Sequence, residues 1–346
     1  MVTPPNAAWM RVATAPATAP ATAPATAPAT ETVAALAFAL VADRVLGEPP
    51  ETAHPVALFG KAMTWGETRW WRDSRCAGGA YCACGVALAV LGAEVVEKVA
   101  WIATGRTRQA SAVALAVAAY VAVASRSLCD AASAVASDLD ADDLAEARLS
   151  LRSLVGRRTD DLDSHEIARA VVESVAENTV DAVIAPLMWG LAAGARGAFV
   201  YRALNTMDAM VGHRSERFER FGWASARLDD VANWLPARVT AALAAICAPA
   251  KTGHIIDAVR HQAPSHPSPN AGVAEAAFAV SLGVRLGGVN DYHGRLENRP
   301  QLGHGRLPSS ADIEAACVLS RRISLAAVLV MGIAALAADW AKGATQ

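Results

Sequence analysis

Charged residues are scarce in this chain of 346 residues: they make up 18% of it, whereas hydrophobic residues make up 53%. The mean hydropathy is positive, at +0.26. A soluble domain usually carries about 25% charged residues. The net charge is −2, so the chain lacks the basic excess that is typical of proteins that bind nucleic acid. The composition therefore predicts a membrane protein with no nucleic-acid partner.

The signature motifs of several enzyme classes are also missing. The chain has no Gly-x-x-x-x-Gly-Lys-Ser/Thr phosphate loop, no Gly-x-Ser-x-Gly elbow and no His-Glu-x-x-His helix. Its six cysteines include no Cys-x-x-Cys pair, which argues against a disulfide framework or a zinc site. Candidate chemistry therefore rests on carboxylates, amides and arginines.

The first 30 residues differ in composition from the rest of the chain. Residues 13–30 repeat Ala-Thr-Ala-Pro four times and end in Ala-Thr. This segment has no large apolar side chain to bury, and its regular prolines oppose a helix. We predict a disordered tail over residues 1–30, followed by a single membrane domain over residues 31–346.

Five apolar stretches follow the tail, and several are shorter than the roughly 20 residues that cross a bilayer. They must borrow flanking residues or pack inside a bundle, and their many small side chains allow helices to approach closely in lipid. The stretches cover residues 32–42, 77–93, 110–125, 182–200 and 323–338. The pattern predicts an all-α, polytopic helical bundle in the cell membrane, in contact with membrane lipid. A soluble alanine-rich helical bundle is the alternative.

Two long polar segments, residues 130–181 and 201–238, lie between the apolar stretches and show helical periodicity. They predict amphipathic or polar helices at the cytoplasmic face. Arg321 and Arg322 precede the last apolar stretch and Asp339 follows it, which favours a cytoplasmic position for its N-terminal end. The stretch at 110–125 has arginines at both ends, so the full topology stays open. Glycine- and proline-rich segments at 264–272 and 283–308 predict loops.

Three carboxylates recur at every fourth position near the end of the first polar segment. Glu173, Glu177 and Asp181 would share one face of a helix. Like charges in such a stripe repel, and a magnesium ion that also binds substrate phosphate would relieve the repulsion. The alternative is that Arg169, four residues before Glu173, pairs with the stripe on a solvated face.

The second polar segment holds two sets of residues that recur at intervals of three. They are Arg202, Asn205 and Asp208, and then Arg227, Asp230 and Asn233. An arginine, an amide and a carboxylate on one helical face can bind a phosphate or carboxylate group and orient a metal or an amine. Ordinary salt bridges between helices are the alternative. Because charge is costly beside apolar stretches, a functional role is favoured.

A third cluster runs from His266 to Glu275 and includes Ser268 and Asn270. Serine and asparagine suit a tight turn or a helix N-cap, and a helix that begins near Gly272 would offer free amides to an anion. A plain capping turn is the alternative. His54, beside a proline, is a lone histidine of the kind that is more often structural than catalytic.

Taken in order, these clusters resemble the CobD/CbiB family of adenosylcobinamide-phosphate synthases, and the resemblance covers residues 40–335. The matching segments are His54-Pro55-Val56, Leu154-Val155-Gly156-Arg157, Ala176-Glu177-Asn178-Thr179, Tyr201-Arg202-Ala203-Leu204-Asn205-Thr206-Met207-Asp208, Ser225-Ala226-Arg227-Leu228-Asp229-Asp230-Val231-Ala232-Asn233, Pro236-Ala237-Arg238, Ser268-Pro269-Asn270-Ala271-Gly272, Glu275-Ala276 and Leu282-Gly283-Val284-Arg285-Leu286-Gly287-Gly288. One departure is Gly47-Glu48-Pro49, where the family usually has Gly-Asp-Pro.

The resemblance implies a multi-pass enzyme of the inner membrane that acts in cobalamin biosynthesis. Such an enzyme joins adenosylcobyric acid, a corrinoid, to (R)-1-aminopropan-2-ol O-phosphate or to aminopropanol through an amide bond. ATP and Mg²⁺ are implied, and the reaction site is expected at the cytoplasmic face. The oligomeric state is not predicted.

The resemblance and the chemistry of the residue types together suggest roles for the polar side chains. Catalysis is expected from Glu177, Asp181, Asp229 and Asp230, as metal ligands or as the base for the amine. Magnesium is expected at Glu173, Glu177, Asp181 and Asp229. Substrate contacts are expected from His54, Asn178, Arg202, Asn205, Asp208, Arg227, Asn233, Arg238, Ser268, Asn270 and Glu275. The arginines would hold phosphate or propionate groups, and the asparagines would orient the amide-rimmed corrinoid.

Two other functions fit a membrane bundle with buried charge. In a permease, Glu177, Asp181 and Arg202 would line a transport route. The long polar segments and the lack of two matching halves argue against this alternative. A non-catalytic sensor or assembly protein on the same fold is the other alternative, and the density of arginine and asparagine motifs argues against it.

Overall fold

The computed structural model describes residues 29–50, 52–105, 107–213, 215–292 and 295–343. The predicted tail lies outside these ranges except for Ala29 and Thr30, which begin the first helix. The elements are α1 (Ala29–Leu46), α2 (Pro55–Trp70), α3 (Arg75–Thr104), α4 (Thr107–Ala122), α5 (Ser125–Asp140), α6 (Leu144–Leu151), α7 (Ser164–Thr179), η1 (Val180–Ile184), α8 (Ala185–Met207), η2 (Asp208–Gly212), α9 (Trp223–Cys247), η3 (Pro249–Lys251), α10 (Thr252–His261), η4 (Ala263–Ser265), α11 (Ala271–Leu282), β1 (Leu286–Tyr292), β2 (Arg295–Leu302) and α12 (Ser310–Gly343).

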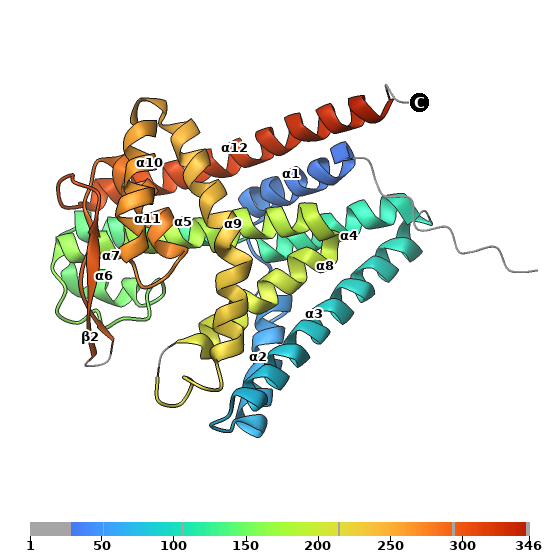
Figure 1. The fold of residues 1–346 in the computed structure, drawn as a ribbon, viewed down its shortest axis with the longest axis horizontal. Coiled ribbons are helices and arrows are strands. Elements are labelled where there is room, and N and C mark those ends of the chain that lie inside the picture. Colours follow the sequence, from blue (N-terminus) through green and yellow to red (C-terminus); the bar gives the residue numbers. More distant parts are fainter. Residues whose placement is uncertain (1–28, 51, 106, 214, 293–294, 344–346) are drawn as a thin grey trace, which may run out of the picture.

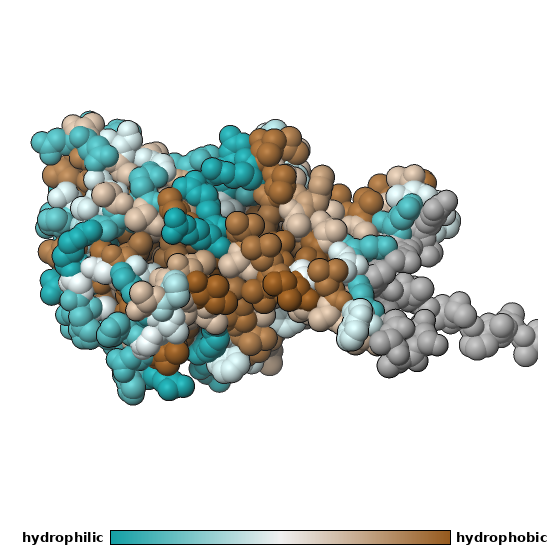
Figure 2. All heavy atoms as spheres, turned by 90° about the horizontal axis from the view of Figure 1, so that it is seen from above, coloured by the Kyte–Doolittle hydropathy of each residue, from teal (hydrophilic) through white to brown (hydrophobic). Residues whose placement is uncertain are grey.

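Four helical segments are long and apolar enough to cross a membrane: Arg75–Thr104, Gln109–Asp140, Ser164–Gly212 and Ser310–Ala341. A fifth candidate is α9 together with the bent segment that follows it. Apolar side chains of α3 and α12 point outward, and Val95 and Ile333 are 61% and 69% exposed. Hydrophilic surface gathers at the end of the molecule that holds the strands, while hydrophobic surface covers the middle (Figure 2). The prediction of an all-α, multi-pass membrane protein is confirmed.

The apolar stretch at 182–200 contains a sharp break in α8. Ala193 and Gly194 have non-helical backbone angles, and Gly194 has a φ of 63°. A Cβ at Gly197 would lie 2.0 Å from the carbonyl oxygen of Trp189, so the two arms of α8 meet closely just beyond the break. Glycine is suited to the positive φ at Gly194, and the lack of a side chain at Gly197 permits the close approach. The break lets the second arm return along the first, where Figure 1 shows it descending beside α3 and α9.

Small residues also allow close packing around α3, α4 and α8. Ala93, Ala114 and Ala198 are buried where α3, α4 and α8 meet, and a Cβ at Gly78 of α3 would lie 1.8 Å from the carbonyl oxygen of Phe221. Close backbone approach of this kind is how helices pack when lipid removes the hydrophobic driving force. The largest cluster of buried apolar residues centres on α7. This helix packs against α5, α11 and α12.

The prediction of a loop over residues 283–308 is wrong for the middle of this segment, which forms two strands. Strands β1 and β2 form an antiparallel hairpin with an irregularity between Leu286 and Gly288. Gly287 and Gly288 have φ values of 86° and 120°, which explains the glycine content without a loop. The hairpin packs on α11 and α7 at the hydrophilic end of the molecule.

Candidate active site: a ring of carboxylates and amides

Five polar side chains form a closed ring where η1, α8 and α9 meet. The hydroxyl of Tyr201 lies 2.9 Å from Oδ1 of Asn233 and 3.4 Å from Oδ1 of Asp181. The Asn233 amide donates to Oδ2 of Asp229 at 3.0 Å. The Asn205 amide closes the ring, at 3.2 Å from Asp181 Oδ2 and 3.5 Å from Asp229 Oδ1. The ring therefore holds two carboxylates on either side of one amide.

The break in α8 and a local widening of the helix bring these residues together. Asp181 and Tyr201 are 20 positions apart, and they meet because the second arm of α8 doubles back. Asp181 lies in η1, a five-residue π-helical turn, and Asp208 begins a second such turn, η2. A π-helical turn redirects side chains relative to a regular helix and often marks a functional site. Both turns in this part of the chain carry a carboxylate from the predicted site.

Further predicted residues surround the ring. Arg202 donates from Nη1 to the side-chain oxygen Oδ1 of Asn205 at 3.3 Å. Asp208 at the start of η2 and Asp230 on α9 are partly buried. Glu177 lies one helical turn before Asp181 and is exposed. Arg227 is also exposed. The two carboxylates of the ring thus have one arginine beside them and further acids nearby, so the site would attract a cation or an amine.

The segment that includes His266, Ser268 and Asn270 is hydrogen-bonded to α9, the helix that supplies Asp229 and Asn233 to the ring. Ser268 Oγ accepts hydrogen bonds from the backbone amides of Asn270 and Ala271, which caps the start of α11. The Asn270 amide donates to the backbone carbonyl of Asp230 at 2.8 Å. Arg238 donates to Asn270 Oδ1 at 2.9 Å and lies over the ring of Trp234. The capping turn that was considered as the alternative is present, and it is also tied to α9.

His54 approaches the site from the loop between α1 and α2. Its Nδ1 accepts from the backbone amide of Val56 at 3.2 Å and so caps α2. Its Nε2 lies 3.9 Å from Glu48, the residue that departs from the family pattern. Burial lowers the pKa of His54, Glu48 opposes this effect, and the positive charge of Arg202 lowers the pKa further. The imidazole is therefore held neutral near the predicted phosphate-binding arginine.

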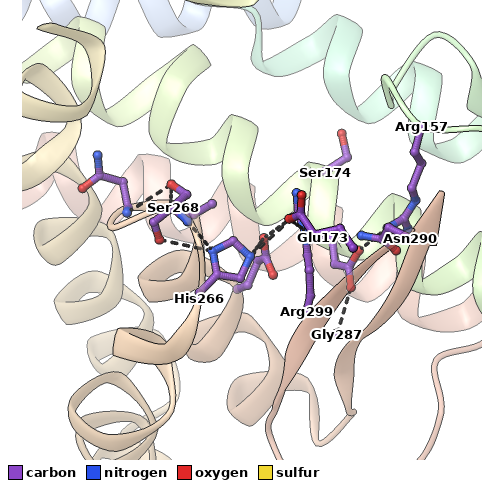
Figure 3. A network of polar contacts seen from close by, with 12 residues as sticks. Arg157, Glu173, Ser174, His266, Ser268, Gly287, Asn290 and Arg299 are labelled. Atoms are coloured by element: carbon purple, nitrogen blue, oxygen red, sulfur yellow. Dashed lines mark hydrogen bonds and ion pairs between the residues drawn. The ribbon is translucent and has the colours of Figure 1, made fainter. Parts of the chain in front are cut away.

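Glu173 belongs to a second network, which binds the hairpin to α7 (Figure 3). Its carboxylate lies 3.1 Å from Arg157 Nη1 and accepts from the Gly287 amide at 2.9 Å. Arg169 lies 3.7 Å away and also donates to the Gly287 carbonyl. Arg157 also donates to the side-chain oxygen of Asn290 in β1. The pairing of Arg169 with the carboxylate stripe, considered from the sequence, is present, but it is buried rather than solvated.

The same network continues to α11 through a buried histidine. His266 Nε2 lies 3.7 Å from Glu275 and 3.3 Å from Arg299 of β2, and Arg299 lies 3.8 Å from Glu275 (Figure 3). The Glu275 side chain is 1% exposed. Its two oxygens have no hydrogen-bond partner among the described residues. Burial and the charge of Arg299 lower the pKa of His266, although a hydrogen bond to the backbone carbonyl of Ser268 opposes this effect.

The structure thus divides the predicted metal ligands between two places. Asp181 and Asp229 lie together in the ring, whereas the oxygens of Glu173 are already bound by arginine and a backbone amide. Asn178, expected to contact substrate, donates to the carbonyl oxygen of Ser174 in its own helix at 2.9 Å. In the part of the chain that the structure describes, no three His, Cys, Asp or Glu side chains form a metal-binding group.

Several residues of the site carried no predicted role. Tyr201 lies in one of the segments that resemble the family, and its place beside Arg202 and near Asn205 is a signal of a role in the site. Arg157 also lies in one of these segments, and His266 begins the third polar cluster. Asn290 and Arg299 had no sequence signal, because their segment reads as a loop and their partners lie up to 133 positions away.

A multi-pass helical membrane protein with a ring of carboxylates and amides among its apolar helices is the class that this fold and site define. A family model described as CobD/Cbib protein matches residues 36–320. The chain belongs to this CobD/CbiB family.

Curated relatives support the assignment over most of the chain. The cobalamin biosynthesis protein CobD of Mycobacterium tuberculosis strain H37Rv is 45% identical over 292 residues, which cover 83% of this chain and 91% of the relative. The protein of the same name from Halalkalibacterium halodurans is 38% identical over 306 residues, with 85% and 93% covered. That from Rhodobacter capsulatus is 39% identical over 314 residues, with 88% and 97% covered. No solved structure matches the chain.

Proposed function

We propose that this protein acts in cobalamin biosynthesis as an ATP-dependent ligase. It would join adenosylcobyric acid to (R)-1-aminopropan-2-ol O-phosphate, or to aminopropanol, and give adenosylcobinamide phosphate or adenosylcobinamide. Family membership and the names of the relatives support the pathway. The observation that carries the catalytic part is the ring in which one amide, that of Asn205, lies between the carboxylates of Asp181 and Asp229.

The reaction requires activation of a carboxylate, because a propionate does not react with an amine until one oxygen can leave. Transfer of the terminal phosphoryl group of ATP to that oxygen would form an acyl phosphate and release ADP. The amine then attacks the carbonyl carbon, the C–N bond forms, the C–O bond breaks and phosphate departs. The nitrogen must lose a proton in this step, and Asp181 or Asp229 would accept it when that carboxylate does not bind magnesium.

The ring also fits a magnesium ion that is held mainly by substrate phosphates. Such ions are usually bound through one or two protein carboxylates, with water and phosphate oxygens completing the shell. Asp181 and Asp229 would hold the ion, and Glu177 one turn away could assist. Bound magnesium supplies positive charge that offsets the charge developing on the phosphates. Glu173 fits this role poorly, because a metal there would compete with two arginines.

Arginines around the ring would bind the large substrate. Arg202 beside Asn205 can hold a phosphate or a propionate. Asn233 and Asn270 are buried. The side chain of Asn233 already binds ring residues and that of Asn270 binds Asp230 and Arg238, so we assign both to positioning the site rather than to the corrin rim. We place this surface at the cytoplasmic face, where the nucleotide is available.

The proposal is tested with membranes that contain the protein. They are incubated with adenosylcobyric acid, aminopropanol phosphate, ATP and magnesium, and the products are measured by mass spectrometry. A parallel reaction with free aminopropanol identifies the amine donor. Folded protein that yields no amide product from either donor would contradict the proposal.

Two variants test the site within the same assay. Asp229→Asn and Glu177→Gln should abolish product while leaving membrane insertion unchanged. Asp160→Asn is the matched control, because Asp160 forms surface ion pairs with Arg152 and Arg158. Full activity in both site variants would show that the reaction occurs elsewhere.

A further inference from the structure

A groove of about 540 Å³ lies between α9 and α10, outside the ring and the hairpin network. The two helices change direction by 113° at the break between them, and Figure 1 shows α10 turning back beside the upper end of α9. Alanine and isoleucine side chains line most of the groove, among them Ala245, Ile246 and Ile256. Ile246 and Ile256 are 59% and 43% exposed, so the groove is open and apolar.

The polar residues of the groove are distributed unevenly along it. Its two charged lining residues are Arg238 on α9 and Arg260 on α10, and both are cationic. On α9 the lining residues extend from Arg238 to the bend, and on α10 they extend from the bend to Arg260. Both arginines therefore lie at the end of the groove that is farthest from the bend. Thr252, near the bend, donates its hydroxyl to the backbone carbonyls of Ala245 and Pro249. The end of the groove farthest from the bend, here called its mouth, is therefore positive, and the end near the bend is apolar.

The charge at the mouth is not neutralised by the protein. Arg238 donates to the uncharged oxygens of Trp234, Pro269 and Asn270. Within the described residues, neither Arg238 nor Arg260 has a carboxylate at ion-pair distance. A ligand that suits this groove is an amphiphile with an anionic head and a hydrocarbon chain. The helices themselves are apolar enough to meet a bilayer, which supplies such a molecule.

We propose that the groove binds an anionic glycerophospholipid of the surrounding membrane. Its phosphate lies at Arg238 and Arg260, and one acyl chain runs toward the bend. The distance along α9 from Arg238 to Ile246 is about 12 Å, at 1.5 Å per helical residue. Because Arg238 also holds Asn270, which binds the backbone of Asp230, the lipid phosphate lies next to the segment that supports the ring.

The test measures lipid retention and requires no enzymatic activity. The full chain is reconstituted into nanodiscs with an excess of phosphatidylcholine over phosphatidylglycerol, and it is then extracted in mild detergent for native mass spectrometry. The wild type should retain one phosphatidylglycerol. Arg260→Gln should reduce that retention about fivefold, the effect of one basic residue near an anionic lipid. Arg260→Lys keeps the charge and should retain the lipid.

A second variant tests the apolar part of the groove. Ala242→Trp places a large side chain at an exposed lining position and should prevent retention of either lipid. Val231→Trp is the control, because Val231 is exposed on the same helix but does not line the groove. Equal retention of the two lipids by the wild type, or retention of phosphatidylglycerol by folded Ala242→Trp, would overturn the proposal. The melting temperature of each variant establishes that it is folded.

Discussion

Replacement of Tyr201 by phenylalanine removes one hydroxyl from the ring and changes little else. The tyrosine side chain is 1% exposed, and phenylalanine fills nearly the same volume. Its hydroxyl is shared between Asn233 at 2.9 Å and Asp181 at 3.4 Å. Tyr201→Phe therefore leaves both groups without this donor, while the packing around the phenyl ring is retained.

The size of the effect follows from burial of the groups that lose the donor. An unsatisfied buried acceptor costs about 1–3 kcal/mol, more when it is charged. If the ring positions Asp181 for proton transfer or for magnesium, much of this cost is expressed in the reaction barrier. A change of about 1.4–2.8 kcal/mol corresponds to roughly a 10- to 100-fold lower kcat. KM for the corrinoid should change less, because the hydroxyl faces the ring.

The assay compares kcat and KM for amide formation with the melting temperature of the same preparation. Tyr81→Phe is the matched control: Tyr81 is fully buried, and its hydroxyl has no hydrogen-bond partner among the described residues. Loss of that hydroxyl should leave kcat unchanged and stability unchanged or slightly higher. Full kcat in Tyr201→Phe, or an equal loss of activity in both variants, would refute this role of the Tyr201 hydroxyl.

Three other predictions concern the hairpin network and the ring. Arg157→Gln removes a cation whose side chain is 4% exposed and should lower the free energy of unfolding by about 3–5 kcal/mol, whereas Arg152→Gln breaks an exposed pair and should cost under about 1 kcal/mol in denaturant titrations. Burial lowers the pKa of His266 in the folded protein below its usual 6.5. As the pH falls, the histidine of the unfolded chain is therefore protonated before that of the folded protein. The contribution of this group to stability is present above about pH 6.5 and is lost as the pH falls through the lower folded pKa. Melting temperatures measured from neutral to acidic pH should therefore fall less steeply in His266→Gln than in the wild type. Asp229→Asn should weaken magnesium binding at least about tenfold in a direct binding titration, roughly 1.4 kcal/mol, and Asp160→Asn should leave magnesium binding unchanged.

Helical periodicity in the sequence predicts the long apolar helices and one contact beside the ring, but it groups Asn233 with Asp230 and Arg227, whereas Asn233 binds Asp229 and Arg227 is exposed. Arg202 and Asn205 were expected to share a face of one helix, and they form a hydrogen bond there. Asn233 was placed on the next site helix and does face the same centre. The spacing of residues within one helix is local information, so a regular helix predicts it well.

The same periodicity could not show that the carboxylate stripe serves two networks. Glu173 and Asp181 share a helical face, but eight residues separate them by about 12 Å along the axis. The hairpin covers one end of that face, and the second arm of α8 covers the other. Which element covers each end depends on the break at Gly194 and on the packing of a segment whose glycines predict a loop. Both are features of tertiary structure.

The buried arginines and carboxylates under the hairpin are best explained by position rather than by stability. A buried ion pair often stabilises no better than apolar residues of similar volume would, because desolvation offsets the attraction. Apolar packing, however, would not fix the hairpin in one register. Gly287 is held at its amide and its carbonyl by Glu173 and Arg169, and Arg299 is thereby placed beside His266. That histidine accepts from the backbone amide of Ser268 at 3.1 Å, and the Ser268 hydroxyl in turn binds the amide of Asn270. The hairpin thus positions the loop that supports the ring, so a displaced hairpin should impair the ring even in a fully folded protein.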